Sequence, residues 1–321
     1  PELNREVADD KKIEIDLGEQ MKLHFGYHRS GWSYALTQLA QINTSTGIYL
    51  DTFIERTFVW GEGDKEPINK PWVGIIHIPP NVPDWFRSRV SNEAVFATEQ
   101  WKQSCPHCKG LFTLSKYHKK ELERYLDIPV YALLHPVDMD VRKWTEQNFF
   151  RNENKKIIQV GWWLRKLHAI YELPQSDYQK VFLRVNKDPY LLELMEAEKE
   201  IHIEEGLFNE EMYATTEVIE YLPDEEYDKM LSENLVFIDL YDSSAKNAII
   251  ECIARNTPIL VNPLDPVKEY LGENYPFYYG SYKEAIEKAS DLDQVILAHK
   301  YLKKLPIKEK LTGEYFRKSL M

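Results

Sequence analysis

The sequence lacks the features that mark membrane, secreted and dinucleotide-binding proteins. No apolar run approaches the roughly 18 residues that cross a bilayer, and no charged-then-apolar leader opens the chain. Three cysteines among 321 residues are too few for the disulfide framework of a secreted protein, so we expect a reducing, cytoplasmic location. Neither Gly-x-Gly-x-x-Gly after a strand nor Gly-Lys-Ser/Thr occurs, so the fingerprints of dinucleotide and ATP sites are missing.

Two of the cysteines form Cys105-Pro-His-Cys108, a spacing that thioredoxin-like redox proteins use. In those proteins the motif opens a helix after a strand. Here it follows a predicted helix (93–102) and precedes a predicted strand (110–114). A zinc site would need a second pair of ligands. Redox chemistry is therefore the less favoured reading of this motif, and a zinc half-site is less favoured still.

The acidic excess is confined to one stretch of the chain. The net charge is −12, and residues 193–226 contain thirteen acidic residues against one basic residue, Lys199, so the remainder is close to neutral. This pattern predicts a solvated helix face and leaves room for a phosphate site elsewhere. It argues against a broad nucleic-acid interface. A chain of this length, 43% hydrophobic, is long enough for two domains with separate cores.

A locally basic segment spans residues 102–124, where only Glu121 and Glu123 oppose the cations. Such a face can rest weakly on anionic lipid, or it can be an ordinary solvated helix face. Both readings remain open. The cations are Lys102, Lys109, Lys116, Lys119, Lys120 and Arg124.

The most informative stretch is 235–271, which predicts a strand, a polar turn, a helix and a second strand. The apolar runs 235–240 and 258–261 are bounded by turn signals, as in strands buried on both faces of a parallel sheet. Ligands bind at the carboxyl ends of such strands, where helix N-termini attract anions. The turn 242–247 is therefore the first place to expect a phosphate group.

These residues resemble the C-terminal signature of GT-B glycosyltransferases of the glycosyl-transferases-group-1 type, which are retaining enzymes. In that family two glutamates eight positions apart hold the donor sugar and the nucleotide ribose. Glu251 matches the second glutamate, whereas Ser243 stands in the place of the first. Asp242 or the hydroxyls of Ser243 and Ser244 are the candidates to replace it. Without the surrounding pattern, Glu251 would be read as a solvated helix carboxylate.

Weaker resemblances extend into the first part of the chain. The segment Arg29-Ser-Gly31-Trp32 after a predicted strand (21–27) is similar to the family's first loop, where glycine admits donor phosphate or acceptor; alternatively, Gly31 only starts a helix. His77 ends the predicted strand 71–78 and resembles the family's histidine near the reacting sugar carbon; otherwise it is a packing residue. We expect His77 to be catalytic.

The second domain is expected to bind the donor. After the predicted strand 156–160, Arg165 and Lys166 resemble the cations that hold the donor diphosphate, with a compressed spacing. Such cations stabilise the negative charge that the leaving diphosphate gains. Leu222 falls where the family contacts the nucleotide base. Lys246 and Asn247 complete the expected donor-binding residues.

The resemblance implies an α/β protein with the GT-B architecture, in which two Rossmann-like domains face a central cleft. We expect an acceptor-side domain over residues 1–140, a nucleotide-sugar domain over 141–305, and a segment, 306–321, that returns toward the first domain. The strand 130–134 and the link His135-Pro-Val-Asp138 precede the expected hinge at 138–154.

The implied activity is transfer of a sugar from a UDP-, GDP- or dTDP-sugar to a glycan, lipid-linked or small hydroxyl acceptor, in the synthesis of glycans or surface polysaccharides. We expect no cofactor and no metal, because protein cations and helix N-termini can neutralise the diphosphate in this fold. Two alternatives remain: a nucleotide-sugar epimerase of the same fold, and a binding module without activity, for which Ser243 in place of the glutamate would account.

Overall fold

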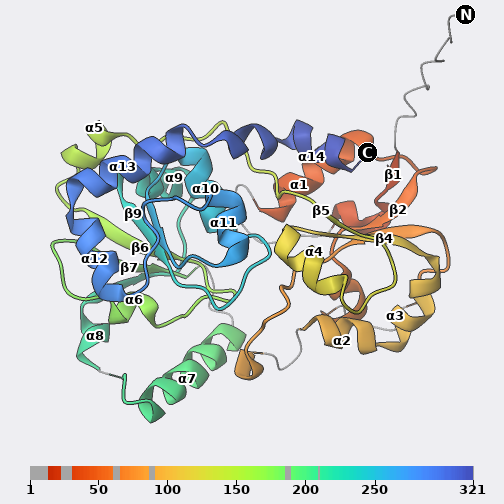
Figure 1. Cartoon of the computed structure of the whole chain (residues 1–321), viewed down its shortest axis with the longest axis horizontal. Coiled ribbons are helices and arrows are strands. Elements are labelled where there is room, and N and C mark those ends of the chain that lie inside the picture. Colours follow the sequence, from red (N-terminus) through yellow and green to blue (C-terminus); the bar gives the residue numbers. More distant parts are fainter. Residues whose placement is uncertain are drawn as a thin grey trace, which may run out of the picture.

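Two five-stranded parallel sheets, each flanked by helices, make up the structure (Figure 1). The computed structural model describes residues 14–22, 31–60, 66–86, 91–184, 189–208 and 210–320. The first sheet has the order β1-β2-β3-β4-β5, and the second has the order β10-β9-β6-β7-β8. The strands are β1 (Ile15–Asp16), β2 (Ile48–Asp51), β3 (Trp72–Ile75), β4 (Cys108–Thr113), β5 (Val130–Ala132), β6 (Lys156–Val160), β7 (Gln179–Leu183), β8 (Thr216–Ile219), β9 (Leu235–Ile238) and β10 (Ile259–Val261).

Helices connect the strands and cover the sheets. In the part of the chain before residue 141, here called the N-terminal part, they are α1 (Trp32–Leu39), α2 (Asn92–Ala97), α3 (Glu99–Ser104) and α4 (Lys116–Leu122). In the remainder, the C-terminal part, they are α5 (Glu146–Arg151), α6 (Ala169–Glu172), α7 (Pro189–Glu204), α8 (Glu211–Ala214), α9 (Asp224–Glu233), α10 (Asn247–Arg255), α11 (Asp265–Leu271), α12 (Tyr282–Ser290), α13 (Leu292–Lys303) and α14 (Gly313–Ser319).

Most expected elements are present close to their predicted bounds, and two differ. The helix expected over 93–102 is divided into α2 and α3 at Thr98, because the Thr98 hydroxyl accepts a hydrogen bond from Trp101 N and so caps a new helix. The strand expected over 21–27 is wrong at its start, where a 3-10 helix (Gly18–Lys22) lies. Residues 23–27 are outside the described residues.

The two parts of the chain share a core. Each residue of β9 is buried, as expected of a strand covered on both faces. Ile78, Val82 and Phe86, from the loop after β3, belong to the hydrophobic cluster of the C-terminal part. This loop therefore crosses from the first sheet and packs against the core of the second.

The end of the chain packs against the N-terminal part. Helix α13 leads across the top of the molecule to α14, which lies beside α1 in Figure 1. Phe316 of α14 is fully buried in the cluster that contains Trp32, and Arg317 donates a hydrogen bond to Gln38 of α1. The domain boundaries at residues 140 and 305 stay predictions, although residue 140 does lie between the two sheets.

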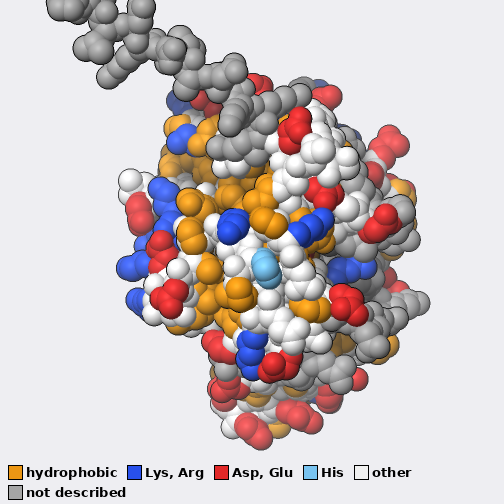
Figure 2. Space-filling view, turned by 90° about the vertical axis from the view of Figure 1, so that its right-hand side faces the viewer, with side chains coloured by type: hydrophobic (Ala, Val, Ile, Leu, Met, Phe, Trp, Pro, Cys, Tyr) orange, Lys and Arg blue, Asp and Glu red, His pale blue; other side chains and the backbone are white. Residues whose placement is uncertain are grey.

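The basic segment 102–124 carries less net charge than its sequence suggests. Three of its cations form ion pairs with nearby carboxylates: Lys102 with Glu99, Lys119 with Glu123, and Arg124 with Glu121. Figure 2 views the molecule from the end where β1 and α3 lie, and basic and acidic side chains are interspersed there. Within the described ranges, no helix combines the length and the hydrophobicity that a membrane span requires. Weak membrane contact stays a prediction.

The Cys105-Pro-His-Cys108 motif does not open an α-helix. Cys105 begins a 3-10 turn and Cys108 begins β4; both thiols are free. Burial raises the pKa of Cys108 to about 12, which disfavours the reactive thiolate. Over the described residues no group of three or more His, Cys, Asp or Glu side chains is placed to hold a metal ion.

Candidate active site

The second sheet changes direction between β6 and β9. The chain runs from β6 outward to β7 and β8, and from β9 the opposite way to β10. In such sheets ligands bind in the crevice at the reversal. The loops that follow the two strands meet there: Lys166 N donates to Asp239 O (2.9 Å), and Tyr241 N donates to Leu164 O (3.1 Å). Arg165 and Leu240 are paired as an antiparallel bridge between these loops.

The two hydrogen bonds and the Arg165–Leu240 bridge form a short ladder between the loops after β6 and β9. Arg165 and Lys166 point to opposite sides of this ladder, as neighbouring residues of an extended segment do. Arg165 is 6% exposed and lies toward Tyr227 and toward Glu251, whose charge acts on it. Lys166 Nζ instead forms an ion pair with Asp239 Oδ2 at 3.0 Å. The structure therefore separates the two cations that the sequence placed side by side on a diphosphate.

Lys246 joins Arg165 in place of Lys166. Both side chains donate to the same acceptor, the Trp163 carbonyl oxygen: Arg165 Nη1 at 3.1 Å and Lys246 Nζ at 2.8 Å. Burial lowers the pKa of Arg165 to about 10. Burial, together with the nearby charge of Arg165, holds the pKa of Lys246 well below its usual range. Two buried cations thus lie close together, and no carboxylate of the described residues forms an ion pair with either one.

Glu251 lies beside these cations on α10. Its carboxylate is 2% exposed, and one oxygen accepts a hydrogen bond from the Tyr227 hydroxyl. The other oxygen, Oε1, and the Arg165 Nε are buried without a partner among the described residues. Since buried polar groups are normally hydrogen-bonded, these two atoms indicate a missing partner. Leu222, in the loop between β8 and α9, is partly buried against the same core.

Helix α10 begins at its N-cap, Lys246, whose side chain does not cap the first N–H groups of the helix. Asn247, the first helical residue, is partly buried. The helix ends at Asn256, which takes the left-handed conformation common at helix C-termini (φ 63°). The N-terminal end therefore adds a partial positive charge next to Lys246.

The turn before α10 connects the two parts of the chain. Asp242 Oδ2 accepts from Asn81 N (2.8 Å) and from the Tyr117 hydroxyl (3.2 Å). Ser244 Oγ accepts from Leu114 N (3.2 Å) and lies 3.1 Å from His118 Nδ1. Ser243 is 2% exposed. In the structure these residues contact other parts of the protein. Their binding of the donor sugar stays a prediction.

His77 lies after β3, close to the start of α1. Its Nε2 is 2.9 Å from the Thr52 carbonyl oxygen, and its ring stacks on Phe53 with centroids 4.0 Å apart. The Trp32 ring meets it edge-on at 4.3 Å. Burial lowers the pKa of His77 to about 3, so the imidazole is neutral at pH 7 and Nε2 carries the proton toward Thr52. Nδ1 is then an acceptor.

The first-loop residues of the expected site are partly visible. Gly31 is the N-cap of α1, and Trp32, which is 5% exposed, begins it. The Trp32 Nε1 is buried without a partner among the described residues. Arg29 lies outside the described residues. The structure therefore brings Trp32 next to His77.

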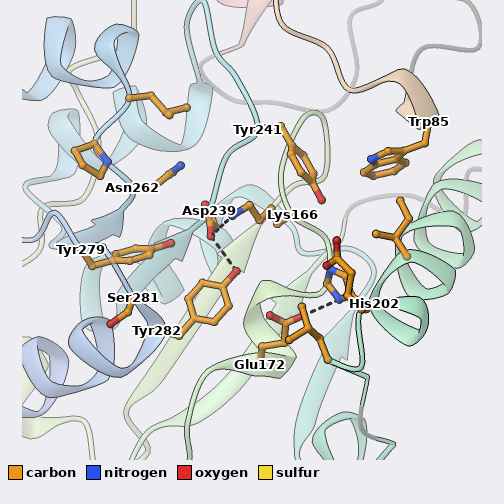
Figure 3. Close-up of a pocket in the computed structure, with 16 residues that line it drawn as sticks. Trp85, Lys166, Glu172, His202, Asp239, Tyr241, Asn262, Tyr279, Ser281 and Tyr282 are labelled. Atoms are coloured by element: carbon orange, nitrogen blue, oxygen red, sulfur yellow. Dashed lines mark hydrogen bonds and ion pairs between the residues drawn. The ribbon is translucent and has the colours of Figure 1, made fainter.

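A cavity that the sequence did not indicate lies on the Lys166 side of the ladder (Figure 3). Its volume is about 760 Å³, and Trp85, Lys166, Glu172, Asp239, Tyr241 and Tyr282 are among the residues that line it. Asp239 and Asn262 directly follow β9 and β10, so polar residues at two strand ends were the available signal. Trp85 comes from the loop after β3, which sequence reasoning could not place against the second sheet.

Known structures share this architecture at low sequence identity. No protein-family model and no curated protein sequence matches the chain. Sucrose-phosphate synthase from Thermosynechococcus elongatus has a TM-score of 0.61 at 10% identity, over 85% of this chain and 71% of that one. The UDP-forming α,α-trehalose-phosphate synthase from Burkholderia vietnamiensis has a TM-score of 0.52 at 10% identity, over 78% of this chain and 65% of that one.

TarM from S. aureus, in complex with UDP and α-GlcNAc-glycerol, has a TM-score of 0.53 at 10% identity, over 78% of this chain. The present chain covers 50% of TarM and 65% of the trehalose-phosphate synthase, so it spans between half and two thirds of these two proteins. At such identities the likeness concerns the fold. The two parallel sheets, the order of their strands and these structural neighbours show that the chain has the GT-B fold, as the sequence predicted.

Proposed function

We propose that the protein is a glycosyltransferase that moves a sugar from a UDP-, GDP- or dTDP-sugar to a hydroxyl acceptor. The observation that carries the proposal is the pair of buried cations, Arg165 and Lys246, at the reversal of the second sheet. Placing two cations together in a buried site is unfavourable unless an anion joins them. A nucleoside diphosphate supplies that anion, and the uncapped start of α10 adds to its binding.

The arrangement also suits the chemistry of transfer. The leaving diphosphate gains negative charge as the glycosidic bond breaks, and fixed positive groups stabilise that change. Arg165 offers a planar fork with an unpartnered Nε, and Lys246 offers a compact charge. Lys166 is ion-paired with Asp239 on the other side of the ladder, so we propose that it does not contact the diphosphate. Glu251 Oε1 would accept a ribose hydroxyl, and Leu222 would face the base.

We also propose, from the family resemblance, that the reaction retains the configuration of the sugar and needs no metal. The same resemblance supports a role in glycan or surface-polysaccharide synthesis. The turn before α10 would contact the donor sugar. Its residues Asp242, Ser243, Ser244 and Asn247 are the proposed contacts. The N-terminal part would hold the acceptor. An acceptor of glycan, lipid-linked or small hydroxyl type is compatible with the position of Trp32 and His77 at the start of α1.

Incubation with UDP-, GDP- and dTDP-sugars, with and without hydroxyl acceptors and with EDTA present, tests the proposal. A transferase releases nucleoside diphosphate faster when the acceptor is added. An epimerase converts the donor sugar without acceptor, and a binding module does neither. Release that does not depend on any acceptor, or epimerisation alone, would contradict the proposal.

His77 is proposed to act near the reacting carbon through Nδ1, which is an acceptor when Nε2 carries the proton. The His77→Ala variant should bind nucleoside diphosphate as the wild type does and transfer sugar about a hundredfold more slowly. Steady-state kinetics and calorimetry measure the two quantities. Because His77 packs against Phe53 and Trp32, the thermal unfolding of the variant must show that it is folded. Wild-type turnover in the folded variant would reduce His77 to a packing residue.

A further inference from the structure

The cavity beside Lys166 is built as a binding site distinct from the Arg165 and Lys246 cluster. Its volume of about 760 Å³ is within the ~300 to 1,000 Å³ typical of small-molecule sites. Loops after β6, β9 and β10 form its floor, and α6, α7 and α12 contribute its sides. Arg165 and Lys246 are not among its lining residues, because they lie across the ladder.

Asp239 is the centre of the polar lining. It is 3% exposed, and its Oδ2 accepts from Lys166 Nζ (3.0 Å) and from the Tyr282 hydroxyl (2.9 Å), as Figure 3 shows. Its Oδ1 is buried without a partner among the described residues. A carboxylate oxygen that is held in place and lacks a donor is suited to accept a hydrogen bond from a ligand hydroxyl.

Two aromatic rings that contact each other also line the cavity. Trp85 and Tyr241 lie edge to face with their centroids 5.5 Å apart, and Tyr241 donates its hydroxyl proton to Glu198. Trp85 is held in position by its neighbour Phe86, which is fully buried and accepts a hydrogen bond from the Tyr190 hydroxyl (3.1 Å). Such fixed rings present apolar faces on which the C–H face of a ligand can pack.

The charge of the lining excludes phosphate. Its carboxylates are Asp239, Glu172 and Glu205, against the single ammonium group of Lys166, which Asp239 already neutralises. His202 Nδ1 lies 2.7 Å from Glu172 Oε1. Burial lowers the pKa of His202, so its imidazole is neutral at pH 7 and adds no positive charge, and burial raises the pKa of Glu172 to about 7. A ligand with anionic groups would be repelled.

From an aromatic wall, an unpartnered acceptor and a lining without free cations, we propose that this cavity binds a saccharide that carries hydroxyl or amino groups and no phosphate. The saccharide packs on Trp85 and Tyr241 and donates a hydroxyl proton to Asp239 Oδ1. This inference does not depend on the assignment of the donor site, since the two sites lie on opposite sides of the ladder.

Saturation-transfer NMR on the full chain tests the proposal with methyl glucoside, methyl galactoside, N-acetylglucosamine, glucosamine, maltose and glucose 6-phosphate. At least one unphosphorylated sugar should bind, and glucose 6-phosphate should bind at least tenfold more weakly. Trp85→Ala and Asp239→Asn should each weaken sugar binding at least tenfold. The control Tyr125→Ala removes an exposed aromatic side chain after α4 and should leave binding unchanged.

The Asp239→Asn variant keeps the shape of the side chain, so it carries the test if Trp85→Ala fails to fold. Sugar binding should persist when nucleoside diphosphate is added, and both variants should keep the wild-type affinity for the nucleotide. The inference would be overturned if no sugar binds, or if glucose 6-phosphate binds as tightly as the unphosphorylated sugars. It would also be overturned if Asp239→Asn keeps the wild-type affinity for the sugar, or if nucleoside diphosphate displaces the sugar.

Discussion

The double variant Arg165→Met, Lys246→Met is expected to bind a nucleoside diphosphate roughly 100- to 10,000-fold more weakly than the wild type. Each cation contributes a charge-assisted hydrogen bond of about 1.5 to 3 kcal/mol, and about 1.4 kcal/mol corresponds to a tenfold change. Methionine replaces the long apolar stems of both buried side chains and removes only the charges. Affinity for the free nucleoside should stay the same, because it lacks the diphosphate. Isothermal titration calorimetry measures both.

Lys166→Met is the matched control. Lys166 is the neighbour of Arg165 in sequence, but it lies on the cavity side of the ladder, where it forms an ion pair with Asp239. It should lose much less affinity than the double variant does. If the double variant keeps the wild-type preference for the nucleoside diphosphate over the free nucleoside, Arg165 and Lys246 do not bind the diphosphate. If Lys166→Met is the more damaging change, the diphosphate lies on the cavity side.

Asp228→Ala should destabilise the protein by about 3 to 5 kcal/mol. Arg255 is fully buried at the end of α10 and pairs through Nη2 with Asp228 Oδ1 of α9. Removal of one partner of a buried pair leaves the other charge uncompensated, which is the costly outcome. The pair joins α9 to α10, the helix that carries Glu251. Its loss should therefore also make the position of Glu251 less fixed. Urea denaturation gives the free energy of unfolding.

The double replacement Asp228→Leu, Arg255→Met provides the control, because it removes both charges and leaves apolar side chains. It should be less destabilised than Asp228→Ala, since replacement of both members of a buried pair by apolar residues often costs little. A loss below about 1 kcal/mol for Asp228→Ala would contradict this expectation and would show that Glu251, whose charge also acts on Arg255, compensates it without Asp228.

The fold was accessible from the sequence because its strands carry clear local signals. The run 235–240 is mostly apolar and bounded by turn residues, the run 156–160 contains Ile157, Ile158 and Val160 and ends before Gly161, and they form β9 and β6. Helix α10 was expected from the same stretch. The division of one expected helix at Thr98 was not expected, because capping by a threonine hydroxyl depends on local geometry that apolar periodicity does not reveal.

The site was accessible only in part. Spacing along the chain placed Arg165 and Lys166 together, whereas the antiparallel bridge between Arg165 and Leu240 turns them to opposite sides. The contact of Asp242 with Asn81 joins residues 161 positions apart, and no local pattern encodes such a contact. Trp85 reaches the cavity for the same reason, through a loop that packs on the other sheet.

A structure of the chain with its tightest-binding nucleoside diphosphate, chosen among UDP, GDP and dTDP, tests the donor site most directly. The proposal predicts diphosphate oxygens within about 2.7 to 3.2 Å of the Arg165 guanidinium and of Lys246 Nζ, at the start of α10. It also predicts a ribose hydroxyl on Glu251 Oε1. A diphosphate bound at Lys166 in the cavity, or away from the end of β6, would contradict the account.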